Sequence, residues 1–243
     1  KAQIEQRAAE RFAKEQQEYK EKLSTREAKE KETGKKSKGR VPTPPEPGPK
    51  KKDQVNLTDS DSRIMPSQGG GFEQAYNGQA AVDIDSMLIV ENHITQQSND
   101  KREIVPAVEN LSGLPDNLGT VDTLLADTGY FSGNNVEECE TNDIAPYIAT
   151  ERQRHNAPPQ DRFIEPEPLT APADPVTKMK HRLKTIAGRA VYAKRKCTVE
   201  PVFGIIKAVM GFRHFLLRGL DLVSGEWDLV CIAYNIKRLY ALR

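Results

Sequence analysis

Short apolar runs recur along this sequence between polar and proline-rich segments, and their spacing predicts a set of strands and helices. Alternation and β-branched residues predict strands at 75–84 and 87–95, which form a hairpin with its turn near Asp83. The other predicted strands lie at 121–127 and 144–149. Helical spacing predicts helices at 101–111, 134–142, 178–196 and 196–215. This order of elements is typical of a mixed α/β domain.

The C-terminal segment from Trp227 to Leu242 has a further apolar face at helical spacing. This face contains Leu229, Ile232, Ala233, Ile236 and Leu239. Because a helix buries its apolar face, we expect these residues to pack over the sheet, and we expect Trp227 to lie in the core.

The N-terminal part of the chain has a different composition. Residues 2–32 predict one exposed, charged helix with ion pairs four residues apart, and the proline- and lysine-rich stretch 33–52 predicts an extended tether. We therefore divide the chain into residues 1–52 and a domain at 53–243. A second proline-rich stretch, 151–177, is an irregular insertion in that domain, and its candidate phosphate contacts are Arg152, Arg154 and Arg162.

Charge is distributed unevenly although the net charge is only +1. Residues 1–52 hold sixteen basic and nine acidic side chains, whereas residues 53–150 hold three and seventeen. The rest of the chain turns basic again. An acidic middle next to a basic C-terminal region suits a metal-dependent enzyme that acts on a polyanion.

Three further features limit the class of protein. Cys139, Cys197 and Cys231 are odd in number and lack paired ligand spacing, so a disulfide framework and a structural zinc site are not expected. No apolar run reaches membrane-spanning length, and no signal peptide is visible. We therefore expect a cytoplasmic protein.

The first chemical motif is Thr120–Asn135, TVDTLLADTGYFSGNN. A short apolar run ends in Asp127, a turn follows, and Ser132 opens a helix. In α/β folds this order places a carboxylate at the carboxyl end of a buried strand, where ligands bind. The alternative is that Asp127 only caps the turn.

The second motif is Tyr192–Arg218, YAKRKCTVEPVFGIIKAVMGFRHFLLR. From Lys178 to Arg218 there are eleven Lys or Arg, and Glu200 is the single acidic side chain. The apolar residues Val202, Ile205, Ile206 and Val209 recur at helical spacing and predict a core-facing stripe. Glu200 would then be a carboxylate on a helix rimmed by cations, or only a favourable charge near a helix N-terminus.

These two motifs, with GGFEQAYNGQAAVDIDSMLIVENHITQQSND and AYNIKRL, resemble the catalytic domain of DDE-type bacterial insertion-sequence transposases. The resemblance implies an RNase H-like α/β fold, a mixed sheet flanked by helices. The family's first catalytic Asp lies in a "DGT"-like strand that has no counterpart here. We therefore expect a C-terminal part of a longer protein that lacks the first strand. Asp59, Asp61 and Asp83 remain alternatives for the missing carboxylate, although they lie in sequences typical of turns and caps.

The resemblance also implies site residues. Asp127 matches the family's second catalytic Asp, and Glu200 matches its catalytic Glu. The resemblance therefore implies catalytic and metal-binding roles for both residues. The family's Tyr–Arg–Glu–Lys signature maps to Tyr192, Arg195, Glu200 and Lys207, with a gap one residue longer than usual, so that Lys196 can take the place of Arg195. The expected DNA-binding residues are Tyr192, Arg195, Lys196, Lys207, Arg213 and Arg218.

The implied activity is metal-dependent cleavage and strand transfer on DNA, with Mg²⁺ or Mn²⁺ held by carboxylates. The implied partners are transposon ends, target DNA and further copies of the chain in the DNA complex, with no membrane. Two alternatives stay open: an inactive or truncated fragment that only binds DNA or a partner, and a metal-dependent nuclease of the same fold. Asp100 is interpreted as an N-cap of the helix at 101–111, and His93 as packed or solvated.

Overall fold

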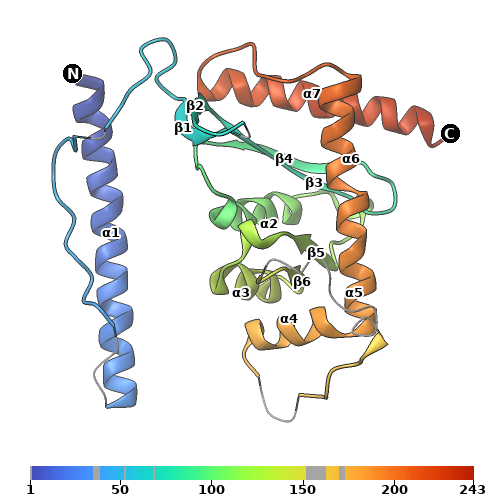
Figure 1. The fold of residues 1–243 in the computed structure, drawn as a ribbon, viewed down its shortest axis with the longest axis horizontal. Coiled ribbons are helices and arrows are strands. Elements are labelled where there is room, and N and C mark those ends of the chain that lie inside the picture. The colour runs from blue at the N-terminus through green and yellow to red at the C-terminus, as the bar shows by residue number, and fades with distance from the viewer. Residues whose placement is uncertain (1, 35–38, 52, 68, 152–162, 170–172) are drawn as a thin grey trace. The chain divides into compact units, whose positions relative to one another are not determined.

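The computed structural model describes residues 2–34, 39–51, 53–67, 69–151, 163–169 and 173–243 (Figure 1). Arg152, Arg154 and Arg162, for which phosphate contacts are predicted, lie outside the described residues. The chain divides into two compact units, Lys1–Ser60 and Asp61–Arg243. Each unit is described by itself.

Unit 1 consists of a long helix and an extended segment that is bound to it. Helix α1 (Ala2–Thr33) confirms the helix predicted at 2–32. The Arg11 guanidinium lies 2.6 Å from the Asp53 carboxylate and donates to the Gly48 carbonyl at 2.8 Å. Lys50 lies 3.1 Å from Glu15. At this end the segment is held against α1, which corrects the prediction that 33–52 acts only as a tether.

The described strands of unit 2 form three two-stranded sheets. Strand β1 (Arg63–Pro66) pairs antiparallel with β2 (Phe72–Ala75), β3 (Asn77–Val82) pairs antiparallel with β4 (Ile89–Thr95), and β5 (Thr123–Ala126) pairs parallel with β6 (Ala145–Ile148). The last two sheets confirm the four predicted strands. The β1–β2 hairpin was not predicted, because its strands are only four residues long and flank a glycine-rich turn.

The helices of unit 2 are α2 (Ile104–Ser112), α3 (Gly133–Thr141), α4 (Pro175–Lys184), α5 (Ile186–Ala193), α6 (Val199–Gly204) and α7 (Leu220–Ala241). Shorter turns include the 3-10 turns η1 (Asp100–Arg102), η3 (Thr128–Tyr130) and η5 (Lys194–Cys197) and the π-helical turn η6 (Ile205–Val209). Figure 1 shows α5 and α6 following each other along one side of the strands. These elements make a mixed α/β domain, consistent with the expected RNase H-like fold.

Two predicted helices differ from the structure. The helix predicted at 178–196 is divided at Thr185, whose extended backbone ends α4 and whose hydroxyl accepts a hydrogen bond from the Gly188 amide at 2.9 Å. The helix predicted at 196–215 ends near Val209, and Gly211 then turns the chain with φ +78°. The wide π turn also leaves Val209 64% exposed, while Val202 and Ile206 are buried as predicted.

Unit 2 has two clusters of buried apolar side chains. One joins the β3–β4 hairpin to α6 and α7 and contains Ile89, Val202, Ile206, Trp227, Cys231 and Tyr234. The other joins β5 and β6 to α2, α3 and α4 and contains Ile104, Val108, Ala126, Val136, Cys139, Ile144, Ile148 and Met179. The position of Trp227 in the core is confirmed. The β3–β4 hairpin and β5 therefore belong to different clusters.

Helix α7 packs with the face opposite to the predicted one. Its buried side chains are Val223, Trp227, Cys231 and Tyr234. On this face the Trp227 indole donates to the Gln79 carbonyl at 2.9 Å, and the Tyr234 hydroxyl donates to the Met87 carbonyl at 3.0 Å. Apolar periodicity missed this face because part of its fit to the hairpin comes from side chains with polar tips.

Candidate active site

Asp127 follows β5 directly, at the carboxyl end of a strand in a parallel pair. Its Oδ1 accepts a hydrogen bond from the Gly129 amide at 2.8 Å and so caps η3. Ser132 then caps α3, as predicted, by accepting from the Asn135 amide at 3.1 Å. Strand, acid, turn and helix therefore occur in the predicted order, and Asp127 caps the turn as well.

A second carboxylate, which sequence reasoning missed, lies beside Asp127. The N-cap predicted for Asp100 is wrong, because Asn99 caps η1 and α2 starts only at Ile104. Oδ1 of Asp100 instead accepts hydrogen bonds from the side-chain amides of Asn77 at 2.7 Å and Gln79 at 2.8 Å. These two residues alternate on β3 and so face the same side. The sequence signal for this position of Asp100 is a pair of side-chain amides two residues apart in a predicted strand.

The carboxylates of Asp100 and Asp127 meet over Gly129. A Cβ added at Gly129 would lie 3.0 Å from Oδ1 of Asp127 and 3.4 Å from Oδ2 of Asp100. The two oxygens can therefore be no farther apart than the sum of these distances. Only a residue without a side chain leaves the space between them open.

Tyr130 adds a neutral donor to the same place. Its hydroxyl donates to the Gln79 side-chain carbonyl oxygen, so Gln79 links Tyr130 to Asp100. Burial raises the pKa of Tyr130, and the charges of Asp100, Asp127 and Glu103 raise it further. This end of β5 is thus a region of negative potential, which favours a cation.

Glu200 lies in the first turn of α6 and points outward. Its side chain is 63% exposed and lies 3.7 Å from the Arg195 guanidinium. Val202, two positions on, is buried and fixes the face that α6 turns inward. Glu200 is therefore bound to the basic segment, as predicted, rather than buried with Asp127.

Tyr192 and Arg195 connect the two predicted catalytic residues. The Arg195 guanidinium lies 5.8 Å from the centre of the Tyr192 ring. Burial raises the pKa of Tyr192, the charge of Arg195 opposes this effect, and the charge of Asp127 adds to it. Arg195, not the exposed Lys196, makes these contacts, which favours Arg195 over Lys196 for the role that the motif implies. The Nε of Arg195 is buried without a hydrogen-bond partner among the described residues.

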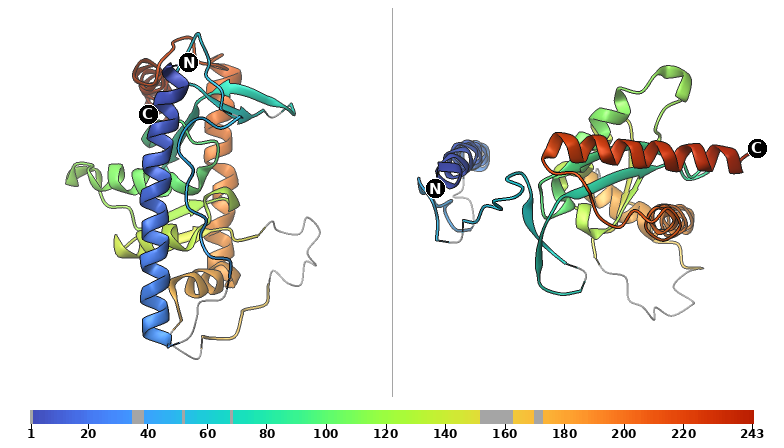
Figure 2. Two further views of the ribbon diagram at one scale, coloured as in Figure 1. Left: turned by 90° about the vertical axis from the view of Figure 1, so that its left-hand side faces the viewer. Right: turned by 90° about the horizontal axis from the view of Figure 1, so that it is seen from above.

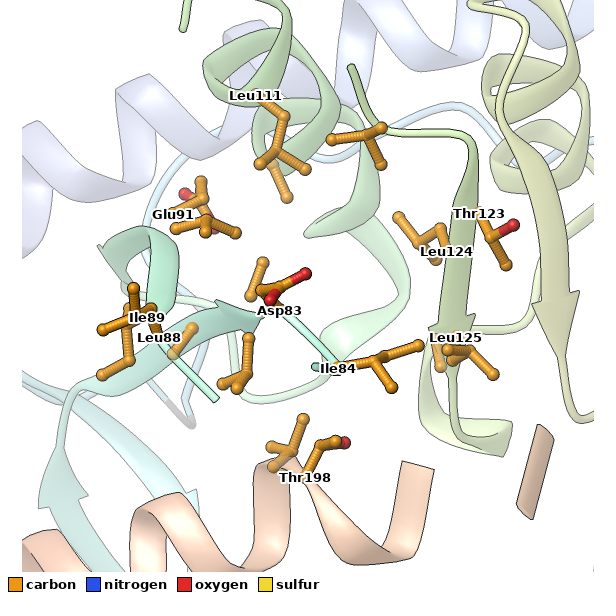
Figure 3. A pocket seen from close by; sticks show the side chains of 18 of the residues that line it. Asp83, Ile84, Leu88, Ile89, Glu91, Leu111, Thr123, Leu124, Leu125 and Thr198 are labelled. Atoms are coloured by element: carbon orange, nitrogen blue, oxygen red, sulfur yellow. The ribbon is translucent and has the colours of Figure 1, made fainter. Parts of the chain in front are cut away.

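A cavity of about 940 Å³ separates the β3–β4 hairpin from β5 (Figure 3). Figure 3 shows Asp83, Ile84, Leu88 and Ile89 on the hairpin side of the cavity and Leu124 and Leu125 on β5. Thr198, which directly precedes α6, lies at a third side of the cavity. Asp100, Asp127, Tyr130 and Arg195 also line the cavity. Lys196, Glu200, Lys207, Arg213 and Arg218 are not among the described residues that line it, and all five are exposed.

A half-buried His lies between two Glu in the lining of the cavity. The His93 ring nitrogens lie 2.7 Å from Glu91 Oε1 and 3.0 Å from Glu103 Oε2. Burial lowers the pKa of His93, but the hydrogen bonds and charges of the two carboxylates outweigh it, so the pKa is raised. His93 is therefore packed, which is one of the two environments expected for it. The second oxygen of Glu91 is buried without a partner in the described part of the chain.

The alternatives for the first carboxylate have local roles. Asp83 Oδ2 accepts from the amide and hydroxyl of Ser86, at 2.8 and 2.6 Å, in the turn between β3 and β4. Asp61 Oδ2 accepts from the Leu220 amide at 3.2 Å, at the start of α7. These contacts agree with the interpretation of both residues as turn and cap residues.

Carboxylates are the side chains that hard divalent cations prefer. Within the described residues, no group of three or more His, Cys, Asp or Glu side chains is arranged to hold a metal ion. The pair Asp100 and Asp127 fits a cation in part, because the space above Gly129 is open to both carboxylates. None of the helices in the described ranges is long and apolar enough to cross a membrane.

A family model described as "Transposase DDE domain" matches residues 40–236. No curated protein and no solved structure matches the chain. The matched range contains every predicted site residue from Asp127 to Arg218, together with Asp100.

Proposed function

Because the chain belongs to the DDE transposase domain family, we propose that its part in transposition is metal-dependent phosphoryl transfer at the ends of an insertion sequence. The observation that carries this proposal is the meeting of Asp100 and Asp127 over Gly129 at the carboxyl end of β5. Ligands of α/β folds bind at such strand ends.

The family generally uses divalent metals, and Asp127 and Asp100 are the residues of this chain that would hold Mg²⁺ or Mn²⁺. Such a cation, when bound, supplies Lewis-acid polarisation of phosphate oxygens. Glu200 would be the further carboxylate predicted from the motif. Because it lies at 3.7 Å from Arg195 and is largely exposed, it needs to leave that ion pair to reach the cation.

The basic residues position the DNA. Arg195 lines the cavity, and its guanidinium, whose buried Nε has no hydrogen-bond partner among the described residues, can donate to a phosphate oxygen. The Tyr192 ring under its guanidinium limits the orientations of this donor. Lys196, Lys207, Arg213 and Arg218 are exposed and supply phosphate contacts that fix DNA in place without reading its sequence.

We also propose that the cavity takes a further strand that carries the first carboxylate. The cavity lies between β3 and β5, and each of these strands has only one partner among the described strands. An added strand would join two sheets into one and fill an apolar space beside Asp127. Unpaired strand edges are templates for such pairing.

The proposal is tested by DNA binding and cleavage. The 243-residue chain should bind DNA with a steep salt dependence but should not cut it, whereas protein expressed from the complete reading frame should cut in the presence of Mg²⁺. In that protein Asp127→Asn and Glu200→Gln should each abolish cleavage with the thermal midpoint unchanged. Retained cleavage in Asp127→Asn would refute the assignment.

A further inference from the structure

The segment 210–219, which joins η6 to α7, exposes two neighbouring leucines. Leu216 is 74% exposed and Leu217 is 47% exposed. In the right-hand view of Figure 2 the segment runs from the column of α5 and α6 to the start of α7. A single exposed leucine is ordinary, so the meaning of this pair depends on how its backbone is held and on which side chains lie next to it.

Carboxylates hold the backbone that carries the two leucines. Both oxygens of Glu226 lie 3.0 Å from the Leu216 amide nitrogen, and Oε2 also accepts a hydrogen bond from the Leu217 amide at 3.0 Å. Asp61 accepts from the Leu220 amide at 3.2 Å, where α7 begins. The backbone at the leucines is therefore fixed by charge-assisted hydrogen bonds, which are stronger than bonds between neutral groups.

Two phenylalanines anchor the same segment to the apolar cluster of the β3–β4 hairpin. The centre of the Phe215 ring lies 6.4 Å from that of Trp227 and 6.3 Å from that of Tyr76, both edge to face. The Phe212 ring lies 6.3 Å from Trp227. Such aromatic pairs add to the energy of burial. Since Phe215 directly precedes Leu216, an anchored ring and an exposed apolar side chain are neighbours in the chain.

The other exposed side chains of the segment are basic. Arg213, His214 and Arg218 are exposed, and none of the three forms an ion pair with another described residue. The sequence contains no acidic residue from 201 to 220. Apolar side chains next to unpaired arginines suit a partner that is anionic on its surface and apolar inside.

A DNA duplex has this combination, because phosphates surround its stacked bases. An anionic lipid surface has it as well. The family of the chain favours DNA, since a DDE transposase domain acts on DNA. Leucine is one of the apolar side chains that proteins insert between base steps to unstack and kink a duplex.

We infer that Leu216 is a wedge that enters a DNA duplex at a base step and unstacks it, while Arg213 and Arg218 bind nearby phosphates. Insertion removes the exposed Leu216 side chain from water, and the fixed backbone means that little ordering is needed when DNA binds. The inference rests on the proposed function, because it describes how the same protein distorts the DNA on which it acts. Phosphate contacts alone would not require an apolar side chain at this place.

The wedge is tested with two duplexes of equal length, one fully paired and one with a single central mismatch. The 243-residue chain should bind the mismatched duplex at least about fivefold more tightly in fluorescence anisotropy, because unstacking costs less at an unpaired base. Leu216→Ala should lose this preference, and Leu216→Met, which keeps an apolar side chain of similar size, should retain it. Arg218→Ala should weaken binding to both duplexes alike.

A second measurement reports the base step itself. The emission of 2-aminopurine placed beside the mismatch should rise when the wild type binds and should not rise with Leu216→Ala at saturation. Leu239→Ala is the matched control, because Leu239 is 52% exposed and lies roughly 28 Å farther along α7 than Leu220. This control should behave like the wild type, and the thermal midpoints of all variants should agree.

The outcomes separate the wedge from the proposed function. Equal affinity of the wild type for both duplexes, or an unchanged preference in Leu216→Ala, would overturn the wedge and leave the proposed function intact. Absence of DNA binding would contradict the proposed function together with the wedge. Binding that depends on Leu216 to vesicles of phosphatidylserine and phosphatidylcholine in equal parts, in place of DNA, would also overturn the inference.

Discussion

Asp100 and Asp127 direct carboxylate oxygens at the same point above Gly129, at 3.4 and 3.0 Å from the position of the Cβ that glycine lacks. The two residues come from different elements, the 3-10 turn that follows β4 and the end of β5. Hydrogen bonds fix both carboxylates, one through side-chain amides of β3 and the other through the Gly129 amide. The two acids therefore lie side by side in a fixed arrangement.

Gly129→Ala should remove cation binding while the domain stays folded. The added methyl would occupy the space between the two carboxylates. These side chains need to shift by only a few tenths of an ångström and can keep their hydrogen bonds, so the effect on stability should be small. Mn²⁺ binding and the thermal midpoint are the measurements. Gly133→Ala is the matched control, because a Cβ there meets only Val176 at 4.0 Å. Equal loss of Mn²⁺ binding in both variants would contradict the role given to Gly129.

Two variants, Asp100→Asn and Asp100→Ala, should distinguish the negative charge of Asp100, which binds the cation, from its hydrogen bonds to Asn77 and Gln79, which stabilise the fold. The Asn variant keeps an oxygen that can accept from Asn77 and Gln79, so it should fold normally and lose cation affinity. The Ala variant removes the acceptor of the Gln79 amide and leaves Asn77 only the Gln97 carbonyl at 3.4 Å, so it should lower the free energy of unfolding by about 1–3 kcal/mol. Urea unfolding and Mn²⁺ titration distinguish the two effects. If Asp100→Asn binds Mn²⁺ like the wild type, Asp100 is only structural.

Arg195→Lys should weaken DNA binding more than Lys196→Arg. A lysine keeps the charge but loses the planar group that contacts Tyr192 and Glu200 and carries the free Nε.

Lys207→Ala should weaken binding for every DNA sequence and lower the salt slope by about one. Fluorescence anisotropy at several salt concentrations measures all three. A larger effect of Lys196→Arg would show that the longer motif gap shifts the role to Lys196.

Stability should depend on pH through His93. Its pKa is raised in the folded protein by Glu91 and Glu103, so the protonated form stabilises the fold. This contribution is fully present below about pH 6.5, the ordinary value, and is lost as the pH rises through the folded pKa. Urea unfolding of wild type and His93→Asn across this range is the measurement. Identical pH dependence in the two proteins would contradict the prediction.

The sequence predicted the strands and Asp127 because alternation and turn residues are local signals. The position of Asp100 could not be predicted, since its role depends on Asn77, Gln79 and Gly129, which meet only after folding. The prediction of which face of α7 is buried was wrong for a related reason. Leu229, Ile236 and Leu239 form the more apolar stripe, but the hairpin binds the side with Trp227 and Tyr234, whose polar tips reach backbone carbonyls.

The central claim is that Asp100 and Asp127 hold one cation, and a Mn²⁺ titration followed by electron paramagnetic resonance tests it most directly. The wild-type chain should bind Mn²⁺, and Asp127→Asn and Asp100→Asn should each weaken the affinity at least about tenfold. Glu109→Gln, at an exposed acid of α2, should leave it unchanged. Unchanged Mn²⁺ affinity in Asp127→Asn would contradict the account.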